Sequence, residues 1–283
     1  MIVALVLVSA FLHALWNALL RVEPDKDRGL VGAITVATLL ATTIAVVRWG
    51  LGDVPFSSYV ALCYTIIAGV FEAVYFMTLV RALERGRLGP VYTVSRGGAV
   101  LVVWPLSIAL FDEIPTWTSA SGSAVVLSGL ILSGLGAHGA DRGGKGRSGI
   151  MWAAACAVSI AGYHLAYKAA LQTGGSPSAT FAVSLGLATV LSILRLGTAG
   201  RAEYVQLLRR RAPRILLMGI VCGGSFLILM EALARGGSGY VLTLRNTSVL
   251  FAAILAFTIG ERPAAAELSG AALVALGAVL MSW

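Results

Sequence analysis

The stretch ALERGRLGPVYT, residues 82–93, returns 150 positions later as ALARGGSGYVLT, residues 232–243, with seven of the twelve positions identical. Three further pairs of motifs recur in the same order along the chain: HALW at 13–16 with HLAY at 164–167, EIP at 113–115 with ERP at 261–263, and glycines 122 and 129 with glycines 270 and 277. Ordered matches at a nearly constant spacing are typical of an internal repeat. We therefore expect two homologous halves.

The composition is that of an integral membrane protein. The 283 residues are 58% hydrophobic and 12% charged, with a mean hydropathy of +0.88. Soluble domains carry about 25% charged residues. The three cysteines lie in separate apolar runs without a CxxC or Cys/His spacing, so no metal site is expected.

Ten segments reach roughly the 20 apolar residues that a membrane-spanning helix needs. They are residues 2–20, 29–47, 57–81, 88–110, 116–137, 149–170, 177–196, 213–234, 238–259 and 264–282. We predict an all-α protein of two five-helix repeats, residues 1–138 and 149–283, joined by a basic cytoplasmic linker at 139–148. An odd number of spans inverts the second repeat, an arrangement that is common in secondary transporters.

The basic residues predict the orientation. Of the 21 Lys and Arg, 16 lie in loops after odd-numbered spans and three in loops after even-numbered spans. The positive-inside rule then places the odd loops in the cytoplasm and both termini outside, in an inner or plasma membrane. Because these basic residues lie mainly in short loops between apolar spans and form no separate basic domain, the net charge of +8 does not indicate nucleic-acid binding.

The HxxWN opening, the ALxRG…GxVxT turn with its copy, and the acidic residues of FDEIP and IGERP resemble the drug/metabolite transporter superfamily. The resemblance is to its ten-helix EamA-type branch and covers essentially the whole chain. It implies export or exchange of small metabolites, including amino acids and related compounds. Many members of the family have cytoplasmic termini, whereas this charge pattern predicts the reverse, so the direction of transport is not carried over.

Ionisable groups inside the spans are the first candidates for function, because each is costly in a bilayer unless it is paired or hydrated. Arg96 and Arg245 each follow by about seven residues, or roughly 10 Å of helix, the glycine that opens their span. Since the two helices enter from opposite faces, both arginines approach the midplane. They could bind an anionic or zwitterionic substrate. Alternatively, Arg96 pairs with Glu72, or either arginine snorkels to an interface.

Glu72, His13 and His164 are the candidates for proton coupling. Glu72 lies near the middle of the third span and could carry protons or serve as a fixed counter-ion for Arg96. The two histidines occupy equivalent positions of the repeats, and imidazole titrates near neutral pH. They could bind substrate, move protons, or be buried histidines that join neighbouring helices.

Aromatic and amide side chains complete the predicted substrate site. They could wall the cavity or donate hydrogen bonds, and the alternative for each is packing between helices. This set comprises Trp16, Asn17, Tyr75, Tyr92, Tyr167 and Asn246.

The sequence thus predicts a monomeric secondary active transporter for a small amino-acid-like or other organic anion or zwitterion. Its other expected partners are membrane lipids. No cofactor is expected, and the chain lacks the GxxxxGK[ST] signature of ATP-driven proteins. One alternative is a flippase for a lipid-linked phosphate. Another is a membrane-embedded enzyme that uses His13 or His164 as a general base, although no nucleophile or metal cluster accompanies them.

Overall fold

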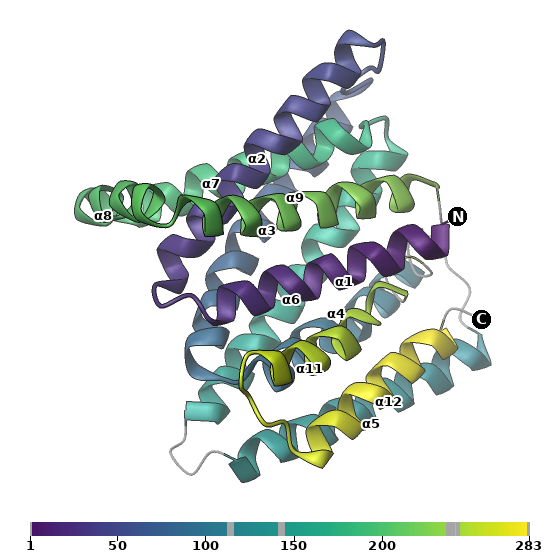
Figure 1. The fold of residues 1–283 in the computed structure, drawn as a ribbon. Coiled ribbons are helices and arrows are strands. Elements are labelled where there is room, and N and C mark those ends of the chain that lie inside the picture. Colours follow the sequence, from purple (N-terminus) through teal and green to yellow (C-terminus); the bar gives the residue numbers. More distant parts are fainter. Residues whose placement is uncertain (1, 112–115, 141–144, 236–240, 242–243, 282–283) are drawn as a thin grey trace.

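The computed structural model describes residues 2–111, 116–140, 145–235, 241 and 244–281 of the chain. The described residues are almost entirely helical (Figure 1). The helices are α1 (Ile2–Arg21), α2 (Lys26–Gly50), α3 (Tyr59–Arg85), α4 (Leu88–Phe111), α5 (Trp117–Ala140), α6 (Lys145–Gln172), α7 (Pro177–Arg195), α8 (Gly197–Arg210), α9 (Ala212–Arg235), α11 (Ser248–Thr258) and α12 (Ala265–Met281).

Several helix starts follow local sequence signals. The Ser58 hydroxyl accepts a hydrogen bond from the Ala61 amide at the start of α3. The Ser176 hydroxyl does the same for Ala179 at the start of α7, where Pro177 occupies the first helical position. Such caps satisfy amides that have no partner within the helix, and proline is tolerated there because its missing amide is not needed.

Length and composition make this a multi-pass membrane protein. Within the described residues, seven helices are long and apolar enough to cross a bilayer: α1, α2, α3, α4, α6, α7 and α9. Three shorter apolar helices lie within α5, α11 and α12. The helical membrane class predicted from the sequence is confirmed, while the count of ten spans stays a prediction.

Two local features differ from the predicted spans. The basic segment after α7 forms the additional helix α8, which was expected to be a loop. The predicted ninth span, 238–259, is interrupted in its described part by a turn at Asn246 and Thr247, before α11 begins at Ser248. The amides of Thr247, Val249 and Leu250 donate to the carbonyl three residues back rather than four.

Some predicted features lie outside the described residues. They are residues 236–240 and 242–243 of the second copy of the repeat motif, Glu113, and residues 141–144 of the linker.

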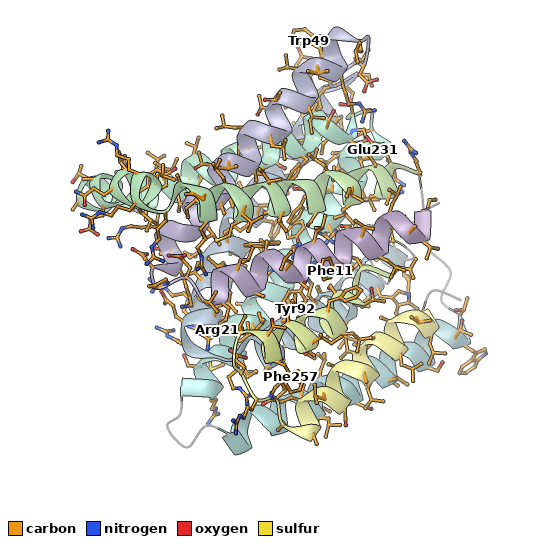
Figure 2. All side chains as sticks on the ribbon, viewed as in Figure 1. Phe11, Arg21, Trp49, Tyr92, Glu231 and Phe257 are labelled. Atoms are coloured by element: carbon orange, nitrogen blue, oxygen red, sulfur yellow. The ribbon has the colours of Figure 1, made fainter. Side chains whose placement is uncertain are left out.

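The helices form one bundle in which α1, α4, α6 and α9 surround a common centre, and α5 pairs with α12 along one flank (Figure 1). The start of α1 and the end of α12 lie at the same end of the bundle. The opposite end, which we call the basic end, is where α1, α3 and α7 finish and α8 lies. Charged side chains gather at this end, as around Arg21 in Figure 2.

Glycines allow α5 and α12 to touch backbone to backbone. A Cβ on Gly270 would lie 2.6 Å from the carbonyl oxygen of Gly129, and one on Gly277 would lie 2.6 Å from that of Gly122. The recurrent glycines of the two halves therefore meet each other across one interface. A Cβ on Gly219 would likewise lie 2.7 Å from the Ala33 carbonyl oxygen of α2, which agrees with the close packing expected of small residues in membranes.

Gly270→Ala is expected to destabilise the protein. The added methyl group would meet the backbone of Gly129 and Ser133, which cannot move without separating α5 from α12. Overpacking of this kind costs about 1–3 kcal/mol. We expect a lower melting temperature in detergent. Gly224→Ala is the control because a Cβ there meets nothing within 4 Å, and equal melting temperatures for the two variants would contradict the close contact.

Candidate substrate site

His13 of α1 lies at the centre of a buried polar cluster. Its Nδ1 atom lies 3.2 Å from Trp16 Nε1, 3.0 Å from Arg245 Nη2 and 3.3 Å from the Ser225 hydroxyl. Its Nε2 atom contacts Arg96 Nη2. None of these side chains is appreciably exposed to solvent, and His13 itself is 0% exposed. Helices α1, α4, α9 and the segment before α11 therefore converge on one imidazole ring.

The two arginines meet on opposite nitrogens of that ring, although they come from different halves of the sequence. A neutral imidazole has one N–H and one acceptor, and a protonated one has no acceptor at all. His13 can therefore accept a hydrogen bond from Arg96 or from Arg245, but not from both. Neither arginine snorkels to an interface, since Arg96 is 2% exposed and Arg245 is fully buried.

The cluster contains several nitrogen donors without an acceptor in the described part of the chain. Arg245 Nε, Arg245 Nη1 and Asn246 Nδ2 are buried and have no hydrogen-bond partner among the described residues. The same holds for the hydroxyls of Tyr92 and Ser248. Aromatic faces supply part of the compensation, since the Arg245 guanidinium lies 4.7 Å from the Phe226 ring centre and that of Arg96 lies 5.9 Å from Tyr92. Chemically, the arrangement is suited to an acceptor with negative charge.

Glu72 lies on α3 and is 0% exposed. Both of its carboxylate oxygens lack a hydrogen-bond partner within the described part of the chain. Its electrostatic neighbours include the hydroxyls of Tyr167 and Ser184 and the more distant charge of Arg245. The ion pairs of the described residues do not include one between Glu72 and Arg96, so the pairing considered from the sequence is absent there.

The two histidines have different surroundings despite their equivalent places in the repeat. His164 Nε2 has no hydrogen-bond partner among the described residues. The ring borders a small cavity of about 10 Å³, about the space of one water molecule, beside Lys168 and Val103. Tyr167, one turn further along α6, shares a 3.0 Å hydrogen bond with the Ser184 hydroxyl of α7. Both arginines thus approach His13 in this conformation, and His164 and Tyr167 lie in a separate polar environment.

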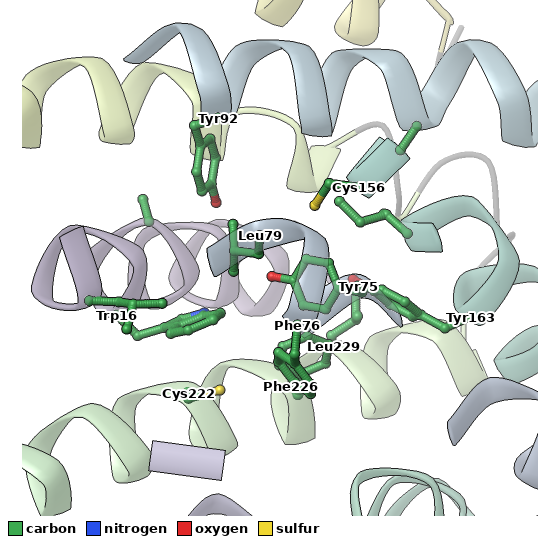
Figure 3. Close-up of a cluster of buried hydrophobic side chains, with 14 of the residues drawn as sticks. Trp16, Tyr75, Phe76, Leu79, Tyr92, Cys156, Tyr163, Cys222, Phe226 and Leu229 are labelled. Atoms are coloured by element: carbon green, nitrogen blue, oxygen red, sulfur yellow. The ribbon is translucent and has the colours of Figure 1, made fainter. Parts of the chain in front are cut away.

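Aromatic rings from several helices gather in the buried core, as Figure 3 shows for Tyr75, Tyr163 and Phe226. The ring centres of Tyr75 and Tyr163 are 5.4 Å apart, and those of His13 and Phe226 are 5.2 Å apart. Trp16 packs edge-on against His13, as the spacing of three residues predicts for one helix face. Asn17 donates to the His13 carbonyl at 2.8 Å, which is a bond within its own helix rather than one directed at the arginines.

Sequence reasoning missed several members of the cluster, notably Ser225 and Phe226 of α9 and Ser184 of α7. Ser225 joins two helices as well as the ring, because its carbonyl accepts a 2.6 Å hydrogen bond from Ser9 of α1. A signal was available, since Ser225 and Phe226 lie 150 positions after Tyr75 and Phe76. No comparable pattern distinguishes Ser184 from the other hydroxyl residues of its helix.

Ion pairs join the helices at the basic end. Glu261, after α11, accepts hydrogen bonds from Arg21 Nε at 2.8 Å and from the Leu88 amide at the start of α4 at 3.0 Å. Glu261 thereby caps the start of helix α4. Glu23, just after α1, is 0% exposed and pairs with Arg211 at 2.8 Å and Arg214 at 3.0 Å, next to the start of α9. These contacts join the ends of α1, α4 and α9 and the segment after α11 at the basic end.

Comparisons with known proteins agree with this architecture. Over 99% of its length, the chain superposes on 98% of a solved crystal structure with a TM-score of 0.66 and 17% sequence identity, which shows a shared fold. No match was found among curated protein sequences. Residues 147–283 match the EamA-like transporter family, whose members are transporters rather than enzymes. The second half of this chain is therefore similar to EamA-like transporters, which agrees with the resemblance to the drug/metabolite transporter superfamily.

Proposed function

We propose that this protein is a secondary active transporter for a small organic anion or zwitterion, with Arg96 and Arg245 as the residues that bind its acidic group. The observation that carries the proposal is the pair of buried guanidinium groups directed at one imidazole without a carboxylate partner among the described residues. Guanidinium grips carboxylate and phosphate through two parallel hydrogen bonds. An acidic group between the arginines would supply the acceptors that His13 lacks.

Several of the other predicted residues would form the wall of the same site. His13, Trp16, Tyr75 and Tyr92 surround the arginines, and Asn246 adds an unused amide donor. His164 and Tyr167 lie on the far side of Tyr163 and would contact the substrate after a rearrangement. The turn at Asn246 supports this assignment, because transporters commonly bind substrate where a spanning helix is interrupted.

Alternating access by two inverted repeats, residues 1–138 and 149–283, is the mechanism we infer. Support comes from helix packing. In the two repeats α1 is equivalent to α6, α2 to α7, α3 to α9 and α5 to α12. Exchanging each helix for its equivalent converts the pair α1 and α9 into α6 and α3, and the pair α2 and α9 into α7 and α3. All four of these pairs are in contact, while α2 and α7, and α5 and α12, are pairs that the exchange leaves in place. Such symmetry provides two conformations of similar energy, each open to one side.

For the orientation, we place the basic end in the cytoplasm of a cell with an inner or plasma membrane and both termini outside. The positive-inside rule supports it, because the arginines of α8 and of the loops at that end are the main concentration of basic side chains. Ten helices in one chain are sufficient to enclose a pathway, so we propose a monomer.

Ligand-induced stabilisation in detergent tests the proposed substrate class. Purified protein is screened for a rise in melting temperature with a panel of carboxylates, phosphate esters, amino acids, amines and neutral sugars. A ligand at 100 times its dissociation constant stabilises the folded state by about 2.7 kcal/mol. We expect shifts only with compounds that carry an acidic group. Stabilisation by amines or neutral sugars alone would refute the anionic assignment, and turnover of any compound would favour an enzyme.

A further inference from the structure

A groove on the flank of the bundle lies away from the central cluster, towards the end opposite the basic end. It has a volume of about 460 Å³ and is formed by α1, α2, α7 and α9. Its wall is aliphatic, with Leu5 of α1, Ile44 of α2, and Leu227 and Ile228 of α9. Its rim carries Arg48, Glu231 and Arg235, and Figure 2 shows Glu231 near the end of α9.

The surroundings of the groove are those of a surface that faces hydrocarbon. Val3 of α1 and Val46 and Val47 of α2 do not line the groove, but they are close in sequence to Leu5 and Ile44, which do. Their side chains are 42%, 56% and 55% exposed. Ile44 lies six residues, or roughly 9 Å, before the end of α2, so the wall reaches below the level of the helix ends. A groove at this depth is open to acyl chains rather than to dissolved solutes.

The charges on the rim are balanced. Arg48 pairs with Glu231 and with Asp53, the latter at 2.7 Å, and Arg235 pairs with Glu231 at 3.0 Å. Two cations and two anions therefore stand at the level where the helices end and lipid headgroups begin. Because the two arginines are already balanced by Glu231 and Asp53, a purely anionic headgroup would add an unbalanced negative charge to the rim. A headgroup that combines a phosphate with an ammonium group can match both signs.

We propose that this groove binds a zwitterionic phospholipid of the adjoining leaflet, with an acyl chain along Ile44 and Leu227, the phosphate at Arg48 and Arg235, and the headgroup amine at Glu231. The site is separated from the central cluster by the contact between α1 and α9, where the Ser9 hydroxyl donates to the Ser225 carbonyl. It is therefore a lipid site distinct from the proposed substrate site, and it does not depend on the transport function.

Native mass spectrometry of the delipidated protein tests the proposal with phosphatidylethanolamine and phosphatidylglycerol added separately at equal concentrations. We expect one phosphatidylethanolamine to bind at least fivefold more tightly than phosphatidylglycerol. Ile44→Trp, which fills the groove, should weaken that binding at least fivefold, and Val46→Trp, on the exposed side of the same helix, should leave it unchanged.

Glu231→Gln provides an independent readout that does not require filling the groove. Removing the carboxylate leaves the rim with an excess of positive charge, so the preference should move towards phosphatidylglycerol. Equal phosphatidylethanolamine binding by the wild type and Ile44→Trp would overturn the location of the site. Tighter binding of phosphatidylglycerol by the wild type, or an unchanged preference in Glu231→Gln, would overturn the zwitterionic assignment.

Discussion

Arg245→Gln is expected to reduce transport about 100-fold while leaving the thermal stability equal to or above that of the wild type. A hydrogen bond to a charged group contributes about 1.5–3 kcal/mol, so losing two from a bound acidic group removes about 3 kcal/mol, or a factor of about 100. Stability should not fall, because the substitution removes a fully buried cation that has no anionic partner among the described residues. Uptake into proteoliposomes and melting curves measure the two effects.

Two further variants separate this role from a structural one. Arg245→Lys keeps the charge but loses the planar fork, so it should retain only part of the activity. Arg81→Gln is the matched control, since Arg81 is 43% exposed and pairs with Glu84 on its own helix. If Arg245→Gln transports within a factor of about three of the wild type, or if its loss of activity follows a loss of stability, the arginine does not bind substrate.

Glu72→Gln is expected to abolish uptake driven by a pH gradient while substrate exchange continues. Glu72 is fully buried and its carboxylate has no hydrogen-bond partner among the described residues, and the ionised form is strongly disfavoured in such a place. Glu72 is therefore suited to exchange its proton when the site opens to water. Glutamine has nearly the same shape but carries no exchangeable charge. Proteoliposomes loaded with substrate and assayed with and without a pH gradient distinguish the two activities.

The control for this prediction is Glu84→Gln, at a carboxylate that is 36% exposed and paired with Arg81. It should retain both activities. Retention of gradient-driven uptake in Glu72→Gln would remove this residue from the coupling mechanism. Loss of exchange together with uptake would instead indicate that Glu72 supports the substrate site, for example through the hydroxyls of Tyr167 and Ser184.

The helical membrane class could be read from the sequence because it depends on local quantities. The length of each apolar run and the positions of capping residues such as Ser58 and Ser176 determine where helices form. Helix α8 was missed because its polar, arginine-rich sequence contains no apolar run of spanning length. It forms where Tyr204 packs against α2 and shares a hydrogen bond with Thr35, which is a contact between distant parts of the chain.

The sequence by itself determined the class of protein, the repeated motifs and the choice of residues that are costly to bury, since each of these follows from composition or spacing. Only the tertiary structure decided which of those residues meet. Arg96 and Arg245 are 149 positions apart, and His13 is far from both, so their convergence depends on how α1, α4 and the segment before α11 pack. The same packing directs both arginines at His13 and leaves Glu72 without an ion pair in the described part of the chain. Contacts between helices depend on the arrangement of the whole bundle rather than on any one segment.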